Sequence, residues 1–257
     1  MIVKTEAIVL KASKYRETSK LVTFYTKRYG KINGIIKGAR QFKNKFGSSL
    51  EPLSYVMIVF YKKESTQLHL VTQCDLLKAF KSISQDLDKL ETALKIIELV
   101  YKVMHDEEEN EKLFSLLNNI LLAIETNNRN FANLFYLFEI KLGEILGYQY
   151  NFSICGKCGV DIYNNGDEML QIVFDYSKGS LMCVDCVKYS VHPHKLSVRI
   201  LKILNRIEKT EQVDSVTNMI ISKQDGNEIG KFLFDYLRYH ISSLKELKSE
   251  KVFSQLF

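Results

Sequence analysis

Four cysteines in the second half of the chain have the residue type and spacing of a metal site. They form two Cys-x2-Cys pairs separated by 24 residues, and they are Cys155, Cys158, Cys183 and Cys186. Each pair can close a tight turn whose two thiolates and backbone N–H groups face one cation. Four thiolates leave no open coordination position, so we expect a structural Zn²⁺ ion, one per chain.

The sequence around the cysteines supports this interpretation. Gly156 and Gly159 supply the backbone freedom that such a knuckle needs. The gap between the pairs slightly exceeds the usual zinc-ribbon spacing, which an inserted hairpin would explain; an iron–sulfur cluster or two disulfides stay as alternatives. His192 and His194 follow the last cysteine, and with four thiolates available we expect them to be ordinary loop residues.

The composition is that of a soluble globular protein, with 257 residues, 46% hydrophobic and 26% charged. No apolar run approaches the length of about 18 residues that a membrane span needs, and the first residues lack the pattern of a signal peptide. We therefore expect a cytoplasmic protein without a membrane contact. In a reducing compartment, paired cysteines favour metal over disulfides, and we expect the isolated Cys74 to be a small buried hydrophobe.

Positive charge is concentrated near the N-terminus. Residues 1–80 hold 15 basic and 5 acidic side chains, whereas residues 81–154 hold 7 and 12. Between Lys11 and Phe46 there are eleven Lys or Arg residues against Glu17 as the only acid, with aromatic residues among them. This composition is typical of a groove that follows phosphates while bases stack on rings, although a merely solvated basic surface is the alternative. The residues we predict to bind DNA are Lys11, Lys14, Tyr15, Arg16, Lys31, Lys37, Arg40, Phe42, Lys43 and Lys45.

The elements that must position these residues follow from the hydrophobic pattern. Five short β-rich runs, at 5–11, 19–26, 31–37, 53–61 and 68–74, indicate a small barrel. The long connection after the third run favours the OB arrangement. From residue 84 to 147 the period changes to about 3.6 and predicts three amphipathic helices, and two more are expected at 197–207 and about 226–247.

We therefore predict an α+β multi-domain protein with an OB-fold barrel, a helical domain and an inserted four-cysteine zinc module. The predicted divisions are residues 1–80 for the barrel, 81–150 with 190–257 for the helices, and 151–189 for the zinc module. We find no phosphate-binding loop, nucleophile elbow or metalloprotease motif, and the basic region lacks clustered acids for Mg²⁺. The chain is therefore not expected to be an enzyme; the alternative is a DNA-processing enzyme, such as a nuclease or nucleotidyl transferase, that grips its substrate with the barrel.

Several stretches resemble the bacterial recombination mediator family RecO. In the N-terminal part they are Glu6-Ala-Ile-Val-Leu-Lys11, the segment from Tyr15 to Leu21, Tyr29-Gly30-Lys31, Lys37-Gly38-Ala39-Arg40 and Leu50-Glu51-Pro52-Leu53. Further on, Leu142-Gly-Glu-Ile-Leu-Gly-Tyr148 runs into the first cysteine pair, and Phe174 leads to the second. The resemblance covers the whole chain in order.

The resemblance implies a DNA repair and recombination protein, associated with the nucleoid, that binds single- and double-stranded DNA and anneals complementary strands. It also implies the partners RecR and the acidic, hydrophobic-ended C-terminal tail of single-stranded-DNA-binding protein, and a role in loading RecA. One departure is Asn44, where related sequences often carry Ser. Some members of the family lack the cysteines, which implies a structural role for zinc.

Overall fold

The computed structural model describes residues 1–257 except 42–44, 64–65, 163–171, 254 and 256–257. The described chain forms two compact units. Unit 1 comprises Met1–Asn127 and Glu246–Phe257, and unit 2 comprises Asn128–Lys245. The predicted three-part division follows sequence pattern rather than compactness, and it stays a prediction.

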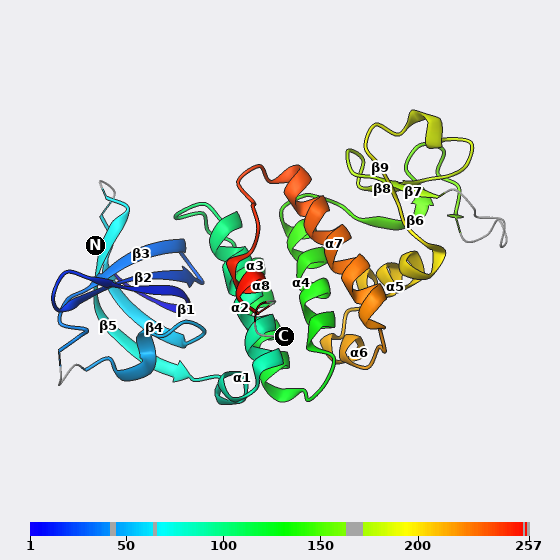
Figure 1. Ribbon diagram of the computed structural model, residues 1–257. Helices are drawn as coiled ribbons and strands as arrows, with labels where there is room; N and C mark the ends of the chain where they lie inside the picture. The colour runs from blue at the N-terminus through cyan, green and yellow to red at the C-terminus, as the bar shows by residue number, and fades with distance from the viewer. Residues whose placement is uncertain (42–44, 64–65, 163–171, 254, 256–257) are drawn as a thin grey trace. The chain divides into compact units, whose positions relative to one another are not determined.

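Unit 1 begins with a closed barrel built from β1 (Ile2–Tyr15), β2 (Ser19–Thr26), β3 (Gly30–Ile36), β4 (Tyr55–Tyr61) and β5 (Leu68–Lys78). The strand order is β1-β2-β3-β5-β4, with β4 pairing back to β1 (Figure 1). This is the OB arrangement that the sequence predicts, with the parallel β3–β5 pair closing the barrel. Side chains alternate between buried and partly exposed along β3 and β4, as expected for strands with one face inside.

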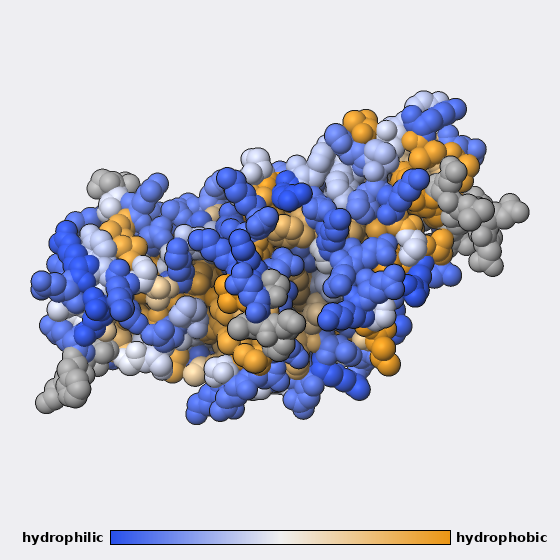
Figure 2. Space-filling view, in the orientation of Figure 1, coloured by the Kyte–Doolittle hydropathy of each residue, from blue (hydrophilic) through white to orange (hydrophobic). Residues whose placement is uncertain are grey.

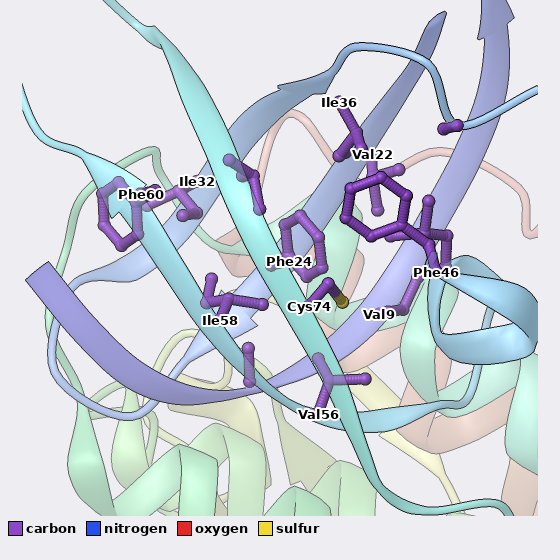
Figure 3. Packing of buried hydrophobic residues seen from close by; sticks show 14 of the residues in the cluster. Val9, Val22, Phe24, Ile32, Ile36, Phe46, Val56, Ile58, Phe60 and Cys74 are labelled. Carbon is purple, nitrogen blue, oxygen red and sulfur yellow. The ribbon is translucent and has the colours of Figure 1, made fainter. Parts of the chain in front are cut away.

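Aliphatic and aromatic side chains fill the barrel (Figure 3). Phe24 and Phe60 are fully buried at its centre, and the short 3-10 helix η1 (Gly47–Leu50) adds Leu50. Cys74 is also buried there, which confirms the sequence-based expectation, and burial raises the pKa of its thiol to about 11. Tyr25 and Phe46, two aromatic residues of the basic region, are likewise buried and present no free ring face.

Helices complete unit 1, and they are α1 (Lys81–Gln85), α2 (Leu87–Val103), α3 (Glu111–Thr126) and α8 (Lys248–Phe253). Asp86 caps α2 by accepting hydrogen bonds from the N–H groups of Asp88 and Lys89, and Asn110 caps α3 by accepting one from the N–H of Leu113. The last helix is held to α2 by Glu98, whose carboxylate accepts bonds of 2.8 Å from the N–H groups of Lys248 and Ser249.

Unit 2 consists of helices and a small four-stranded sheet. The helices are α4 (Phe131–Ile145), α5 (Val198–Glu208), α6 (Val213–Thr217) and α7 (Lys223–His240), and the strands are β6 (Asn151–Cys155), β7 (Val173–Asp175), β8 (Ser180–Met182) and β9 (Pro193–Lys195). The sheet order is β6-β8-β7-β9. The core is rich in aromatic residues, with Phe152, Phe174 and Phe232 in mutual ring contact. A further 3-10 helix, η3, spans Val187–Tyr189.

The predicted helices are confirmed with one correction. The stripes at 87–101, 113–121, 134–145 and 197–207 lie within α2, α3, α4 and α5, apart from the capping residue Ser197. The expected helix at 226–247 is wrong at its end, because α7 stops at His240 and the following residue, Ile241, is extended. Short helices α1, α6 and α8 were not predicted, since five or six residues carry too little periodicity to recognise.

Candidate metal centre and nucleic-acid interface

The four cysteines converge at one point of unit 2. Their sulfur atoms all lie within 4.8 Å of one another, and the sulfurs of Cys158 and Cys183, from different pairs, are 3.7 Å apart. A tetrahedral ion with Zn–S bonds of about 2.3 Å holds its sulfurs roughly 3.8 Å apart, so this separation fits zinc. None of the five cysteines is in a disulfide. The four thiolates therefore form a set that could hold one metal ion.

Strand pairing explains why two cysteine pairs with 24 residues between them meet. Strand β6 ends at Cys155 and runs parallel to β8, while β7 and β8 form the hairpin between the two pairs that the spacing predicts. At Gly156 a Cβ atom would lie 1.8 Å from Ser180 Oγ, so only glycine permits this approach. Gly159 has φ +75°, the left-handed conformation that closes the first knuckle.

Backbone donors favour the thiolate form of Cys155. Burial opposes ionisation of Cys155, but hydrogen bonds from backbone N–H groups, including those of Cys158 and Cys183, outweigh it and lower the pKa of this thiol to about 6. Metal ions bind the thiolate form, so this environment prepares one ligand at neutral pH. His194 instead bonds through Nδ1 to the hydroxyl of Tyr176 at 3.0 Å, in agreement with the expectation that it is not a ligand.

A buried carboxylate organises the segment that follows the second cysteine pair. Asp175 accepts hydrogen bonds from Ser177 at one oxygen and, at the other, from Ser190 Oγ at 2.7 Å and the N–H of Val191 at 2.8 Å. Burial alone would raise the pKa of Asp175, but these bonds lower it to about 2. The carboxylate thus ties the β7–β8 hairpin to residues 190–191. Sequence reasoning missed this residue, because a single Asp at the end of a short strand carries no distinctive signal.

The predicted DNA-binding residues all belong to unit 1, and most of them reach its surface. Six are exposed, namely Lys11, Lys14, Arg16, Lys37, Arg40 and Lys45, while Tyr15 and Lys31 are half-buried. Phe42 and Lys43 lie outside the described residues, as does Asn44. Hydrophilic side chains, drawn blue, dominate the face of the barrel that Figure 2 shows.

One group gathers at a single end of the barrel. Arg40 joins the two loops there: its backbone N–H donates to Thr18 O at 2.9 Å, and its guanidinium donates to the carbonyl oxygens of Arg16 and Glu17, each at 3.0 Å. Strand register brings Lys14 opposite Lys20, and Lys20 opposite Ile36, which directly precedes Lys37. We call this set the barrel-end cluster; it consists of Lys14, Tyr15, Arg16, Lys37 and Arg40.

The remaining residues are engaged elsewhere in unit 1. The ammonium group of Lys31 lies 3.3 Å from the Asp106 carboxylate and donates to Tyr101 O at 3.1 Å. Lys45 donates to Thr72 O at 2.9 Å. Lys11 lies over the ring of Tyr101, 5.1 Å from its centroid. Of these three, Lys31 is the least available, since its charge already faces a carboxylate.

The acidic segment between α2 and α3 covers part of the barrel. Besides the Lys31 pair, Asn33 donates to Asp106 at 3.1 Å, and Glu107 bonds the buried His69 at 3.0 Å. The N–H of Glu107 also donates to Lys31 O at 2.8 Å. This segment thus occupies the outer side of β3 and β5, and the barrel-end cluster lies away from it along β3. The run of acids is plain in the sequence, but nothing local indicates where it docks.

A pocket of about 460 Å³ lies between β1, α2 and α8 of unit 1. Its walls are largely apolar, with Leu10, Leu94 and Ile97 among them, and three lysines, Lys11, Lys102 and Lys248, also line it. Apolar side chains are visible where the barrel meets α2 (Figure 2). The sequence did not predict this pocket, because its walls come from positions as far apart as 10 and 249.

A closed OB-type barrel followed by helices, with a four-cysteine cluster, defines an OB-fold protein that carries a metal-binding module. Comparison with known proteins makes this specific. The family models Recombination protein O N terminal and Recombination protein O C terminal match residues 1–80 and 84–250. The chain therefore belongs to the RecO family, whose members act in DNA repair and recombination.

Curated relatives agree over nearly their full length. The DNA repair protein RecO of Chloroherpeton thalassium is 29% identical over 259 residues, covering 100% of this chain and 99% of the relative. Those of Syntrophus aciditrophicus and Thermodesulfovibrio yellowstonii are 30% and 31% identical, covering 98% and 96% of this chain and 95% and 96% of the relatives. No helix in the described part of the chain combines the length and the apolar composition that a membrane span requires.

The first prediction concerns the metal. Purified protein should contain one zinc per chain, and Cys155→Ser or Cys183→Ser should abolish tight zinc binding and destabilise residues around 150–190, because structural zinc contributes on the order of 10 kcal/mol to its module. Elemental analysis and hydrogen exchange measure both effects, with Cys74→Ser as the control that keeps its zinc. Iron in place of zinc, or four free thiols in an intact module, would contradict the assignment.

The second prediction concerns Asp175. Its folded pKa of about 2 lies below the unfolded value of about 3.9, so the carboxylate stabilises the fold by about 2.6 kcal/mol above about pH 5, and this contribution is lost as the pH falls towards 2. Asp175→Asn should therefore be less stable than the parent protein at pH 6 by about this amount in urea unfolding, and the difference should shrink below pH 4. A difference independent of pH would show that the charge has no role.

Proposed function

We propose that the protein is a non-enzymatic recombination mediator that binds single- and double-stranded DNA and anneals complementary strands. With RecR it helps to load RecA onto single strands coated by single-stranded-DNA-binding protein. Membership of the RecO family supports this assignment. The observation that carries the DNA-binding part is the barrel-end cluster, where two loops present positive charge with few acids nearby.

The cluster suits a phosphate backbone better than a base-specific contact. Lys14, Arg16 and Lys37 are exposed and lie on neighbouring strands or turns, and the guanidinium of Arg40 donates to carbonyl oxygens, which carry no formal charge to offset its own. Lysine and arginine side chains that neutralise phosphates release counterions and bind every sequence alike. Tyr15, half-buried with the Arg16 guanidinium 5.3 Å from its ring centroid, offers a ring for base stacking.

This arrangement explains annealing without chemistry on DNA. Cations on a strand's phosphates reduce the repulsion between two complementary strands. Binding through the phosphates does not depend on sequence and leaves the base edges free to pair. We therefore expect purified protein to join complementary strands without ATP and to leave labelled DNA uncleaved and unextended when metal ions are added.

The third prediction tests the barrel-end cluster. Lys37→Ala/Arg40→Ala should lower the slope of log K against log salt for single-stranded DNA by about 0.7 for each phosphate that the protein no longer neutralises, and it should slow annealing. A binding titration across a salt series measures the slope. Lys202→Ala/Lys209→Ala, which removes two charges at α5 in unit 2, is the matched control and should keep the slope.

Arg40 requires a further control because it also joins two loops. Arg40→Lys keeps the charge but cannot reproduce the paired bonds to the carbonyl oxygens of Arg16 and Glu17. It should therefore keep the salt slope while lowering affinity modestly. A folded Lys37→Ala/Arg40→Ala protein with unchanged slope and annealing rate would place the DNA site elsewhere.

We also propose that the pocket of unit 1 receives the C-terminal tail of single-stranded-DNA-binding protein. The tail is acidic with a hydrophobic end, and the pocket offers apolar walls with three lysines around them. Among its described lining residues the single carboxylate is Glu98, which already accepts bonds from Lys248 and Ser249. Burial opposes ionisation of Glu98, but these bonds and Lys102 lower its pKa. The pocket therefore has a positive balance that complements an acidic peptide.

The fourth prediction follows from this pocket. Lys248→Glu should weaken binding of a synthetic tail peptide by about tenfold at low salt, because a charge reversal at the rim replaces attraction by repulsion. Isothermal calorimetry measures the change, and Lys81→Glu on α1, outside the pocket lining, is the matched control. If the parent protein fails to bind the peptide, this partner is wrong for the chain. If Lys248→Glu and Lys81→Glu bind the peptide with equal affinity, the peptide site lies outside this pocket.

A further inference from the structure

Unit 2 presents a row of aromatic rings on its surface. The rings of His192 and Tyr239 have centroids 4.8 Å apart, Tyr239 and His240 are 4.9 Å apart, and His240 stacks on Tyr148 at 4.5 Å. Tyr239 is 42% exposed and His192 is exposed, so part of the row faces solvent. Tyr239 also contacts Tyr176, with ring centroids 5.9 Å apart, so the row forms the outer edge of the aromatic core.

A further exposed ring lies on the same segment as His192. Tyr189 is 50% exposed, and with Tyr239 it makes up the exposed tyrosines in the described part of unit 2. The ammonium groups of Lys157 and Lys188 lie over its ring, the latter 5.3 Å from the centroid. The Asp175 bonds to residues 190 and 191 fix the backbone between Tyr189 and His192. We call the set Tyr189, His192, Tyr239, His240 and Tyr148 the ring surface.

Positive side chains border the ring surface. Lys188 and Arg238 directly precede its two exposed tyrosines, and Lys195 follows the β9 residue His194. Asp235 lies 3.2 Å from Arg238 and offsets part of its charge, and Asp185 is exposed in the second knuckle. Long cationic side chains beside solvent-exposed rings are the combination that binds single-stranded nucleic acid, where bases stack on rings and cations reach phosphates.

We propose that the ring surface is a second contact for single-stranded nucleic acid, separate from the barrel-end cluster. The inference rests on the proposed function, because a protein that anneals strands benefits from holding two of them. Bases stack on the exposed faces of Tyr189 and Tyr239, and Lys157 and Lys188 move from the ring to the phosphates. The contact is blind to sequence, since every base has a π face.

The number of short strands bound per chain tests this proposal. The full zinc-loaded protein is titrated with an oligothymidine of about eight nucleotides, short enough for one site. The parent protein should bind two. The variant Tyr189→Leu/Tyr239→Leu keeps apolar volume but removes both rings, so it should bind one strand normally and the other at least about 30-fold more weakly. Lys37→Ala/Arg40→Ala should also bind one, through the ring surface. The matched control is Val184→Ala/Ile220→Ala, which removes exposed apolar side chains of unit 2 outside the ring surface and should still bind two.

Photo-crosslinking of the same oligonucleotide to the parent protein, followed by peptide mapping, should mark peptides that contain Tyr189 or Tyr239. If the folded, zinc-loaded variant Tyr189→Leu/Tyr239→Leu still binds two strands with unchanged affinity, the proposal is overturned. The ring surface would then be a candidate surface for binding a protein. The second contact alone would be rejected if the parent protein and the ring variant each bind one strand and the barrel variant Lys37→Ala/Arg40→Ala binds none. The DNA site at the barrel-end cluster would then stand. No binding by the parent protein would reject the proposed function as well.

Discussion

The ion pairs between the barrel and the segment from Asp106 to Glu109 determine where free positive charge remains in unit 1. The most basic part of the chain and one of its most acidic segments meet at β3, where Lys31 pairs with Asp106. Lys62 pairs with Glu107 at 3.6 Å on the neighbouring side. Charges that face each other have little attraction left for a polyanion. The exposed lysines and arginines at the barrel end keep their attraction for a polyanion. The positive electrostatic potential of unit 1 is therefore concentrated at this end.

The position of this acidic segment does not depend on the ion pairs alone. Partly exposed pairs such as Lys31 with Asp106 are worth about 1 kcal/mol or less. The fit of the backbone is more demanding, because Gly30 has φ +59° and a Cβ atom there would lie 2.1 Å from Glu108 O. Only glycine allows the segment to approach, and the bond from Glu107 N–H to Lys31 O then fixes the register. The steric fit at Gly30 therefore sets the position of the acidic segment, and the ion pairs favour this position over others.

Local sequence was sufficient to predict the strands, the longer helices and the four-cysteine cluster. Alternation along β3, the 3.6-residue stripe along α3 and the two Cys-x2-Cys pairs each lie within a short stretch, so pattern alone predicts them. Lys31 shows the limit of such reasoning. The charge count placed it among the predicted DNA contacts, and that stays a prediction. Its ion pair with Asp106 joins residues far apart in the chain, so no local pattern indicates it. The pocket and the attachment of α8 through Glu98 depend on still longer separations.

The metal module shows how a short segment acquires a fixed surface. Strands β7 and β8 have three residues each, and so small a sheet cannot support itself on strand pairing. Two constraints can replace a larger core: a metal ion held by the four cysteines would fix the knuckles, and the Asp175 carboxylate fixes the segment beyond them through Ser190 and Val191. Because both act on the backbone immediately before and after Tyr189, the ring keeps its orientation without being buried. A structural metal at this site would in this way assist the proposed contact at Tyr189 without touching the nucleic acid, since it would reduce the entropy that an exposed side chain loses on contact.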